Sequence, residues 1–318
     1  MLPKFFYSLR RIISGFRPLN LLLIFGLHQI IQLVYSRHYL SHNLQEHPPE
    51  LLCVLNQLMW ASIALASAGY LINDYYDQRT DAINKPEKKP NLLISHKVVF
   101  WSFWMSLNLI AFYLGFIIDA TVEHSNYVCL FIVISVVLFG YNLSRWSKFI
   151  IGPVLISALV ALNLLLAQDL ALNHYAKALT DISYDAVEAL FAPTKHWIWG
   201  IAYLGFISNF IRELIKDIED INGDQNAGRR TLPVVLGVAR TANIAVAFGI
   251  ILVLSLGVFA AIAFNSSIPL GVNLTVALAL AVWITYKCTK IERPSQAKSL
   301  SLTLKLLLVL GLLSLYWL

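Results

Sequence analysis

The chain has 318 residues, of which 58% are apolar and only 13% are charged, and its mean hydropathy is +0.67. These values lie far from those of soluble proteins, so we interpret the chain as an integral membrane protein. Its three cysteines form no Cys-x-x-Cys pair and its eight histidines are scattered along the chain. These residues therefore do not show the spacing that predicts a zinc or haem site.

Residues 1–18 combine apolar side chains at helical spacing with basic ones. This pattern predicts an amphipathic segment that lies in the cytoplasmic headgroup layer. Apolar runs of the length that a helix needs to cross a bilayer, about 17 to 25 residues, follow it. They lie at 19–36, 51–72, 98–118, 126–143, 149–168, 197–216, 242–264, 268–287 and 299–318. We therefore expect an all-α membrane protein in which residues 19–318 form a single domain of nine transmembrane helices.

The loops between these runs alternate in charge. Lysine and arginine gather before the first run and after the second, fourth, sixth and eighth, whereas the other loops are poor in both. By the positive-inside rule, the N-terminus lies in the cytoplasm and the C-terminus lies outside. The stretch 169–195 is then predicted to be the longest outside loop, with a short surface helix near its end.

Two acidic clusters stand at the ends of apolar runs, both on the predicted cytoplasmic side. The first comprises Asp74, Asp77 and Asp81, preceded by Asn73, and the second comprises Asp217, Asp220 and Asp224. Their shared i, i+3, i+7 spacing keeps three carboxylates within an arc of roughly 60° on an ideal helix. Glu219 projects from roughly the opposite side. Gly223 would allow the second helix to unwind before Asp224, which would separate that carboxylate from the other two.

Carboxylates at membrane depth need compensation, because each costs about 2.5 to 3.5 kcal/mol on insertion scales. Magnesium prefers oxygen ligands and usually takes one or two carboxylates, leaving its other positions to water and phosphate oxygens. The two clusters therefore predict a diphosphate held through Mg²⁺. The simpler alternative is that these acids are solvated residues at helix ends.

Further polar side chains accompany the clusters. Asn209, Glu213 and Lys216 form a stripe that leads along the sixth run to the second cluster, as expected for a face that lines a cavity or meets a partner helix. Near the end of the fourth run, Tyr141, Arg145 and Lys148 share one helical face. They would bind phosphate or act as interfacial anchors, and spacing favours neither. The basic loops after the clusters carry Lys88 and Lys89, and Arg229 and Arg230.

Both acidic clusters resemble the aspartate-rich signatures of the UbiA superfamily of intramembrane prenyltransferases. The matching patterns are Asn73-Asp74-x-x-Asp77-x-x-x-Asp81 and Asp217-x-Glu219-Asp220-x-x-Gly223-Asp224. Arg17-Pro18-x-Asn20 and Tyr141-x-x-x-Arg145 fit as well. The chain departs from many relatives after the first cluster, where Lys88-Lys89-Pro90-Asn91 replaces an arginine, a proline and a glycine turn. Lysine keeps the charge but lacks the bidentate fork of arginine.

The resemblance implies a nine-helix bundle around a central cavity, in which Mg²⁺ and basic side chains stabilise departing diphosphate. It implies catalytic roles for Asp74, Asp77, Asp217, Asp220 and Tyr141. The implied metal ligands are Asn73, Asp74, Asp77, Asp81, Asp217, Asp220 and Asp224. The implied substrate-binding residues are Asn20, Asn73, Lys88, Lys89, Arg145, Lys148, Glu213, Lys216, Arg229 and Arg230.

The expected activity is transfer of a polyprenyl group from its diphosphate to a hydrophobic or amphiphilic acceptor in the bilayer, with no role for nucleic acid. The sequence around the second cluster is most similar to the geranylgeranylglycerol-phosphate geranylgeranyltransferase branch. Prenylation of an aromatic quinone precursor is the alternative within the family. Other classes are a cation- or proton-coupled transporter and a CDP-alcohol phosphotransferase, whose Asp-Gly-x-x-Ala-Arg motif is absent. The sequence leaves the oligomeric state, the donor chain length and the general base open.

Overall fold

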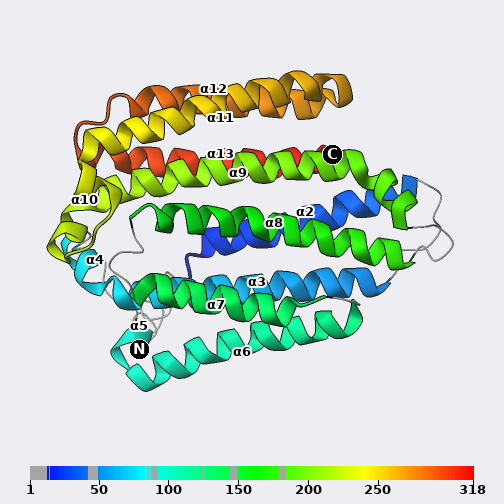
Figure 1. Ribbon diagram of the computed structural model, residues 1–318, viewed down its shortest axis with the longest axis horizontal. Coiled ribbons are helices and arrows are strands. Elements are labelled where there is room, and N and C mark those ends of the chain that lie inside the picture. The colour runs from blue at the N-terminus through cyan, green and yellow to red at the C-terminus, as the bar shows by residue number, and fades with distance from the viewer. Residues whose placement is uncertain are drawn as a thin grey trace, which may run out of the picture. The chain divides into compact units, whose positions relative to one another are not determined.

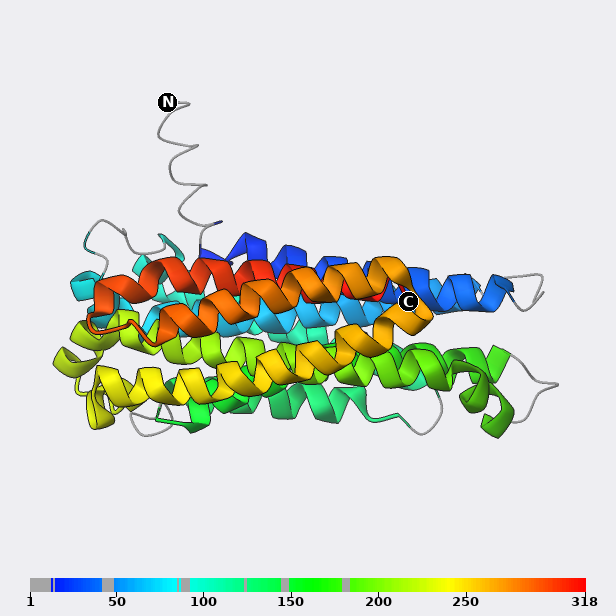
Figure 2. The same ribbon diagram turned by 90° about the horizontal axis from the view of Figure 1, so that it is seen from above.

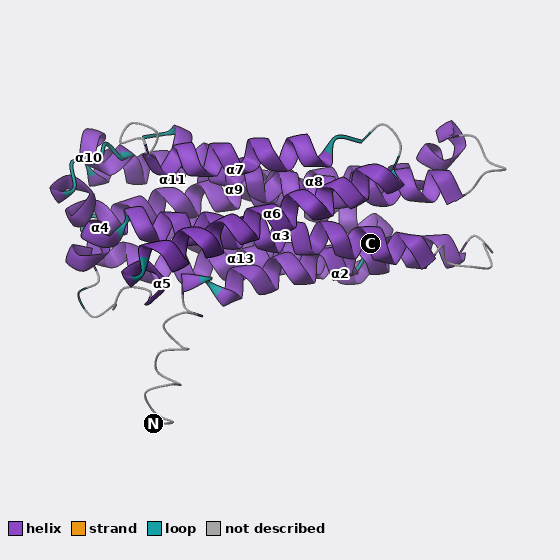
Figure 3. Ribbon diagram, turned by 90° about the horizontal axis from the view of Figure 1, so that it is seen from below, coloured by secondary structure: helices purple, strands orange, loops and turns teal. Residues whose placement is uncertain are grey.

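The computed structural model describes residues 13, 15–41, 49–84, 86, 92–122, 125–143, 149–178 and 184–318. The side chains at 38–41, 49–51, 92, 175–178 and 184–185 fall outside this description. All regular secondary structure in the described residues is helical, as Figure 3 shows by colour, and none of them forms a strand. The predicted all-α class is therefore confirmed.

Each of the nine predicted apolar runs coincides with a helix. These helices are α2 (Pro18–Ser41), α3 (Pro49–Tyr76), α6 (Lys97–Thr121), α7 (Tyr127–Leu143), α8 (Ile151–Ala178), α9 (Tyr184–Asn226), α11 (Val238–Ser266), α12 (Ile268–Cys288) and α13 (Ala297–Tyr316). Within the described residues, eight of them are long and apolar enough to cross a membrane, whereas α7 has 17 residues and is shorter. The chain is thus an integral, multi-pass membrane protein.

Short helices connect several of the long ones. They are α4 (Gln78–Asn84), α5 (Leu92–Ser95), α10 (Leu232–Leu236) and the 3₁₀ turn η1 (Pro294–Gln296). The chain divides into two compact units, the first made of residues 1–28 and 49–145 and the second of residues 29–48 and 146–318. Figure 1 labels the helices of both.

In the first unit, α6 packs against α3 and α7. Gly115 lets α6 approach α7 closely, because a Cβ there would stand 2.9 Å from the Phe131 ring and 3.1 Å from the backbone nitrogen of Val128. The buried hydroxyl of Ser135 donates to the Asn108 side chain at 2.5 Å, which adds a polar link between the same two helices. Small residues and interhelical hydrogen bonds are the usual means of helix association in lipid.

In the second unit, α9 packs against α8, α11 and α13, while α12 lies beside both α11 and α13 (Figure 2). Gly249 of α11 faces Thr285 of α12 so closely that a Cβ would meet the threonine Oγ1 at 2.5 Å. Asn273 of α12 donates to the hydroxyl of Ser314 on α13 at 2.7 Å. The packing of α9 against α8, α11 and α13 places it inside the unit, where it carries the second acidic cluster.

The stretch 169–195, predicted as a long loop, is mostly helical. Helix α8 continues to Ala178 and α9 already begins at Tyr184, with Pro193 inside it. Helix α9 has 43 residues, a length of about 65 Å at the α-helical rise, which is twice the hydrocarbon thickness. The predicted helix near the end of this stretch is present as the beginning of α9. The prediction of a long loop was wrong, because polar residues beyond an apolar run can continue its helix.

Candidate functional site

The first acidic cluster spans a bend between two helices. Helix α3 ends at Tyr76, Asp77 occupies the bend and Asp81 lies in the first turn of α4. Backbone hydrogen bonds still run from the Asp77 amide to the Asn73 carbonyl at 2.9 Å and from the Asp81 amide to the Asp77 carbonyl at 2.8 Å. The continuous helix assumed for this cluster is therefore interrupted, while its turn-by-turn spacing is largely retained.

Asn73 and Asp77 are joined across one turn. The Asn73 side-chain amide donates to Oδ2 of Asp77 at 2.7 Å. Asp74, between them in sequence, is buried at 7% exposure, whereas Asp77 and Asp81 are half-buried. The Asn73 amide thus orients the carboxylate of Asp77. The buried carboxylate of Asp74 requires a compensating charge.

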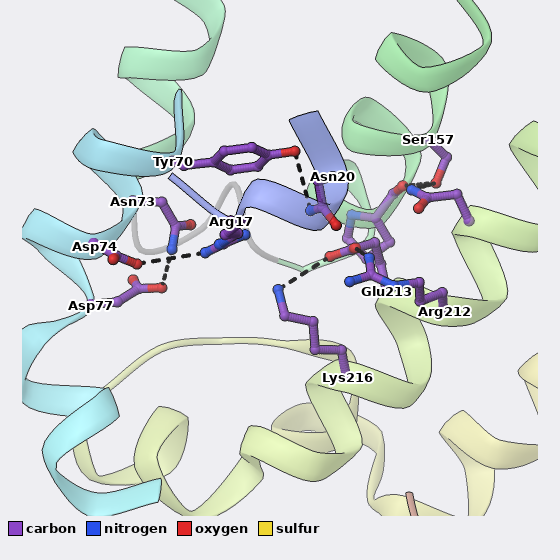
Figure 4. Close-up of polar contacts among 12 residues, drawn as sticks. Arg17, Asn20, Tyr70, Asn73, Asp74, Asp77, Ser157, Arg212, Glu213 and Lys216 are labelled. Carbon is purple, nitrogen blue, oxygen red and sulfur yellow. Dashed lines mark hydrogen bonds and ion pairs between the residues drawn. The ribbon is translucent and has the colours of Figure 1, made fainter. Parts of the chain in front are cut away.

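Arg17 supplies that charge from the segment before α2 (Figure 4). Its Nη2 lies 3.7 Å from Oδ1 of Asp74, and its guanidinium carbon lies 4.8 Å from the centre of the Tyr70 ring. Asn20, at the start of α2, donates to the Tyr70 hydroxyl at 3.2 Å. The Arg17-Pro18-x-Asn20 motif therefore docks on the last turns of α3, where it contacts Tyr70 and the first aspartate of the acidic cluster.

Arg17 adopts an unusual backbone conformation for this purpose. Its φ is +50°, the one positive φ of a non-glycine residue in the described chain, and a proline follows it. Left-handed conformations cost a non-glycine residue about 1 to 3 kcal/mol and persist only where surrounding contacts determine them. The ion pair and the stacking on Tyr70 are such contacts.

The second acidic cluster lies on one continuous helix. Helix α9 runs through Gly223 to Asn226, so the unwinding that this glycine would allow does not occur. Asp217, Asp220 and Asp224 consequently keep the i, i+3, i+7 spacing that places three carboxylates within roughly 60°. Glu219 projects from another side of the same helix.

The end of α9 fixes the last aspartate. Asp224 is 4% exposed, and Nη1 of Arg229 lies 3.3 Å from its Oδ1. The Arg229 amide also donates to the Asp224 carbonyl at 2.9 Å, across a turn in which Gly228 has φ +67°. Glycine suits this left-handed position after a helix end. Arg230, the next residue, is exposed.

The polar stripe on α9 includes an arginine that the sequence analysis overlooked (Figure 4). Nη1 of Arg212 donates to Oε1 of Glu213 at 2.5 Å, and Nζ of Lys216 lies 3.7 Å from Oε2 of the same carboxylate. Deeper in the helix, buried Asn209 donates to the hydroxyl of Ser157 on α8 at 3.2 Å. The stripe thus contains a packed amide and a Lys–Glu–Arg group.

The structure describes less of the remaining predicted site residues. Tyr141 is half-buried near the end of α7. Four lie outside the described residues, so their positions stay predictions: Lys88, Lys89, Arg145 and Lys148.

The donor atoms of both clusters suit Mg²⁺ by their chemistry. They are carboxylate and amide oxygens, and Mg²⁺ takes one or two carboxylates and leaves the rest of its coordination to water and phosphate. Among the described residues, no three His, Cys, Asp or Glu side chains gather closely enough to hold a metal ion by themselves. The residues therefore fit an ion that is bound together with a phosphate ligand better than a closed structural metal site.

Comparison with known proteins gives the family. Residues 43–312 match the model of the UbiA prenyltransferase family. This chain belongs to that family. The resemblance noted in the two acidic clusters and the assignment as a prenyltransferase are thereby confirmed.

Several curated relatives of this UbiA prenyltransferase carry one name, digeranylgeranylglyceryl phosphate synthase. The protein of Korarchaeum cryptofilum is 28% identical over 249 residues, which cover 77% of this chain and 79% of the relative. That of Thermococcus gammatolerans is 29% identical, covering 62% and 63%, and that of Thermococcus kodakarensis is 30% identical, covering 59% of each. The match thus spans about three-fifths of the length of the two Thermococcus relatives.

A solved structure from work on digeranylgeranylglyceryl phosphate synthase in membranes has the same fold. It aligns with this UbiA chain at a TM-score of 0.63 and 18% identity, covering 98% of both chains. At this identity the likeness concerns the fold alone.

Sequence reasoning missed Tyr70 and Arg212 as members of the polar groups. Tyr70 lies one turn before Asp74 on α3, and Arg212 lies one turn before Lys216 on α9. A signal was present in both cases, because helical residues four apart share a face. A tyrosine or an arginine in an apolar run is more often an interfacial anchor, so their spacing was not interpreted as part of a polar site.

Proposed function

We propose that this UbiA prenyltransferase transfers a geranylgeranyl group from its diphosphate to a glycerol-phosphate lipid. The bond between the allylic carbon and the diphosphate oxygen breaks, an acceptor hydroxyl oxygen forms an ether with that carbon, and the hydroxyl proton is lost. The observation that carries the proposal is that the curated relatives share one name, digeranylgeranylglyceryl phosphate synthase. This chain, which is similar to them, has both acidic clusters.

The donor diphosphate is assigned to the two acidic clusters through Mg²⁺. The residues that would hold the metal are Asn73, Asp74, Asp77, Asp81, Asp217, Asp220 and Asp224. When bound, Mg²⁺ neutralises the charge that develops on the departing diphosphate. Asn73 orients Asp77, Arg17 forms an ion pair with Asp74, and Arg229 holds Asp224 in place.

Basic and polar side chains complete the proposed assignment. Tyr141 takes part in catalysis. The residues that contact the substrates are Asn20, Lys88, Lys89, Arg145, Lys148, Arg229 and Arg230. We also propose that residues 19–318 form one domain with nine crossings, preceded by an interfacial segment at 1–18, and that the acidic clusters face the cytoplasm. The positive-inside distribution of lysine and arginine supports this orientation.

Product analysis tests the proposal. Purified protein is given geranylgeranyl diphosphate with either geranylgeranylglyceryl phosphate or an aromatic acid, and products are identified by mass spectrometry. We expect a digeranylgeranyl lipid, and diphosphate release that stops with a chelator and returns with Mg²⁺. A prenylated aromatic acid as the sole product would instead assign a quinone-precursor enzyme.

Two adjacent acids on α9 provide a matched pair. Asp220→Asn should lower the rate of diphosphate release at least about 100-fold, because a carboxylate that binds the metal is lost. Glu219→Gln removes the neighbouring charge on another side of the helix and should stay within about threefold of the wild type. Asp77→Ala should match Asp220→Asn. Unimpaired release in both aspartate variants would contradict the assignment.

A further inference from the structure

The Nε–H of Arg212 meets no hydrogen-bond acceptor among the described residues. Its side chain is 11% exposed, and its Nη1 is held by Glu213. Its Nε–H, however, is buried and donates to nothing within the part of the chain that the structure describes. Buried donors in native proteins nearly always have a partner, so an unsatisfied guanidinium nitrogen calls for an explanation such as an absent ligand.

The neighbouring charges favour an anionic ligand. Glu213 bridges Arg212 and Lys216, and these three side chains carry a net charge of +1. With Nη1 occupied by Glu213, the Nε–H and Nη2 of Arg212 form the remaining planar fork. That fork matches two oxygens of a phosphate or a carboxylate, and Lys216 adds a second positive charge nearby.

The depth of Arg212 separates this ligand from the donor diphosphate. Along α9, Arg212 precedes Asp217, Asp220 and Asp224 by about 7, 12 and 18 Å of helical rise. A diphosphate bound through the metal ligands at Asp217, Asp220 and Asp224 is therefore about one to three turns away. The second anion in the proposed reaction is the phosphate of the acceptor lipid.

We propose that Arg212 and Lys216 bind the acceptor's phosphate, and that Glu213 is a positioning residue that fixes both cations. This assignment rests on the proposed function, because that reaction supplies a phosphorylated acceptor. It predicts that the enzyme distinguishes a phosphorylated lipid from the corresponding free alcohol. The acceptor site is thus a charged group on α9, one to two turns deeper than the first carboxylates of the second cluster.

Lipid binding without the donor tests the proposal directly. The full chain in detergent or nanodiscs is titrated with geranylgeranylglyceryl phosphate and with geranylgeranylglycerol, its dephosphorylated form. The wild type should bind the phosphorylated lipid about 10- to 100-fold more tightly, as expected for hydrogen bonds to charged groups. Arg212→Gln should abolish that preference, and Arg212→Lys should retain part of it. Arg240→Gln, at an exposed position of α11, should leave it unchanged.

Steady-state kinetics add an independent readout. Arg212→Gln should raise the KM for the phosphorylated acceptor about 10- to 100-fold and leave the KM for geranylgeranyl diphosphate within about twofold. Equal losses with both lipids, a preserved phosphate preference, or a shift confined to the donor's KM would overturn the assignment. Absence of prenyl transfer by the wild type would refute the proposed function instead, and phosphate-dependent binding lost in Arg212→Gln would still establish the anion site.

Discussion

Arg17 shows how one residue can connect a backbone conformation, a buried charge and an aromatic ring. Its positive φ turns the chain into α2 and brings its guanidinium onto Tyr70 and Asp74. The buried carboxylate of Asp74, which is 7% exposed, then has a cation 3.7 Å away that compensates its charge. The motif Arg17-Pro18-x-Asn20 is thus a structural support for the first acidic cluster.

Substitutions at Tyr70 should separate its two contacts. Tyr70→Phe removes only the hydrogen bond to Asn20 and should destabilise the protein by about 0.5 to 1.5 kcal/mol. Tyr70→Leu also removes the ring under Arg17, which adds about 0.5 to 1 kcal/mol. Unfolding in mixed micelles measures the stabilities, and the KM for the donor reports on Asp74. Equal effects of the two substitutions would show that the cation–π contact is unimportant.

At the scale of elements, close helix packing depends on glycines at particular positions. Gly249 of α11 lies against Thr285, whereas Gly257 of the same helix has nothing within 4 Å of an added Cβ. The two positions therefore form a matched pair that differs in packing but shares helical propensity.

The pair predicts opposite outcomes for the same substitution. Gly249→Ala should destabilise the protein by about 1 to 3 kcal/mol, because its Cβ would stand 2.5 Å from Thr285 Oγ1 and force α11 and α12 apart. Gly257→Ala should be neutral or stabilising by up to about 1 kcal/mol, since alanine favours helix. Midpoints of thermal or detergent unfolding measure both. If Gly257→Ala were the more damaging, packing against α12 would not be the cause.

At the scale of the whole molecule, the length of α7 decides the topology. This helix has 17 residues, at the lower end of the range that crosses a bilayer. If it crosses, the chain has nine crossings and its termini lie on opposite sides of the membrane.

Reporter fusions should reveal that topology. Alkaline phosphatase fused after residue 318 should be active outside the cytoplasm, whereas the same enzyme fused after residue 226, at the end of α9, should be inactive. Green fluorescent protein at the two positions should give the reverse pattern. Phosphatase activity at both positions would place the second acidic cluster on the outer side of the membrane and contradict the proposed orientation.

The sequence by itself determined the helices and the two acidic clusters. A bilayer leaves helices as the simple way to satisfy backbone hydrogen bonds, so every long apolar run had to become one. The spacing of Asp217, Asp220 and Asp224 then placed three carboxylates on one face, since α9 continues through Gly223. Family membership followed from the same local patterns.

Only the tertiary structure decided which polar groups meet. The bend at Asp77 and the continuation of α8 and α9 beyond their apolar runs depend on local packing, which hydropathy does not encode. The contact of Arg17 with Tyr70 joins residues far apart in the chain, so no periodicity could reveal it. The Nε–H of Arg212, which has no partner among the described residues, depends on side-chain direction and burial, and these exist only once α9 is packed within its unit.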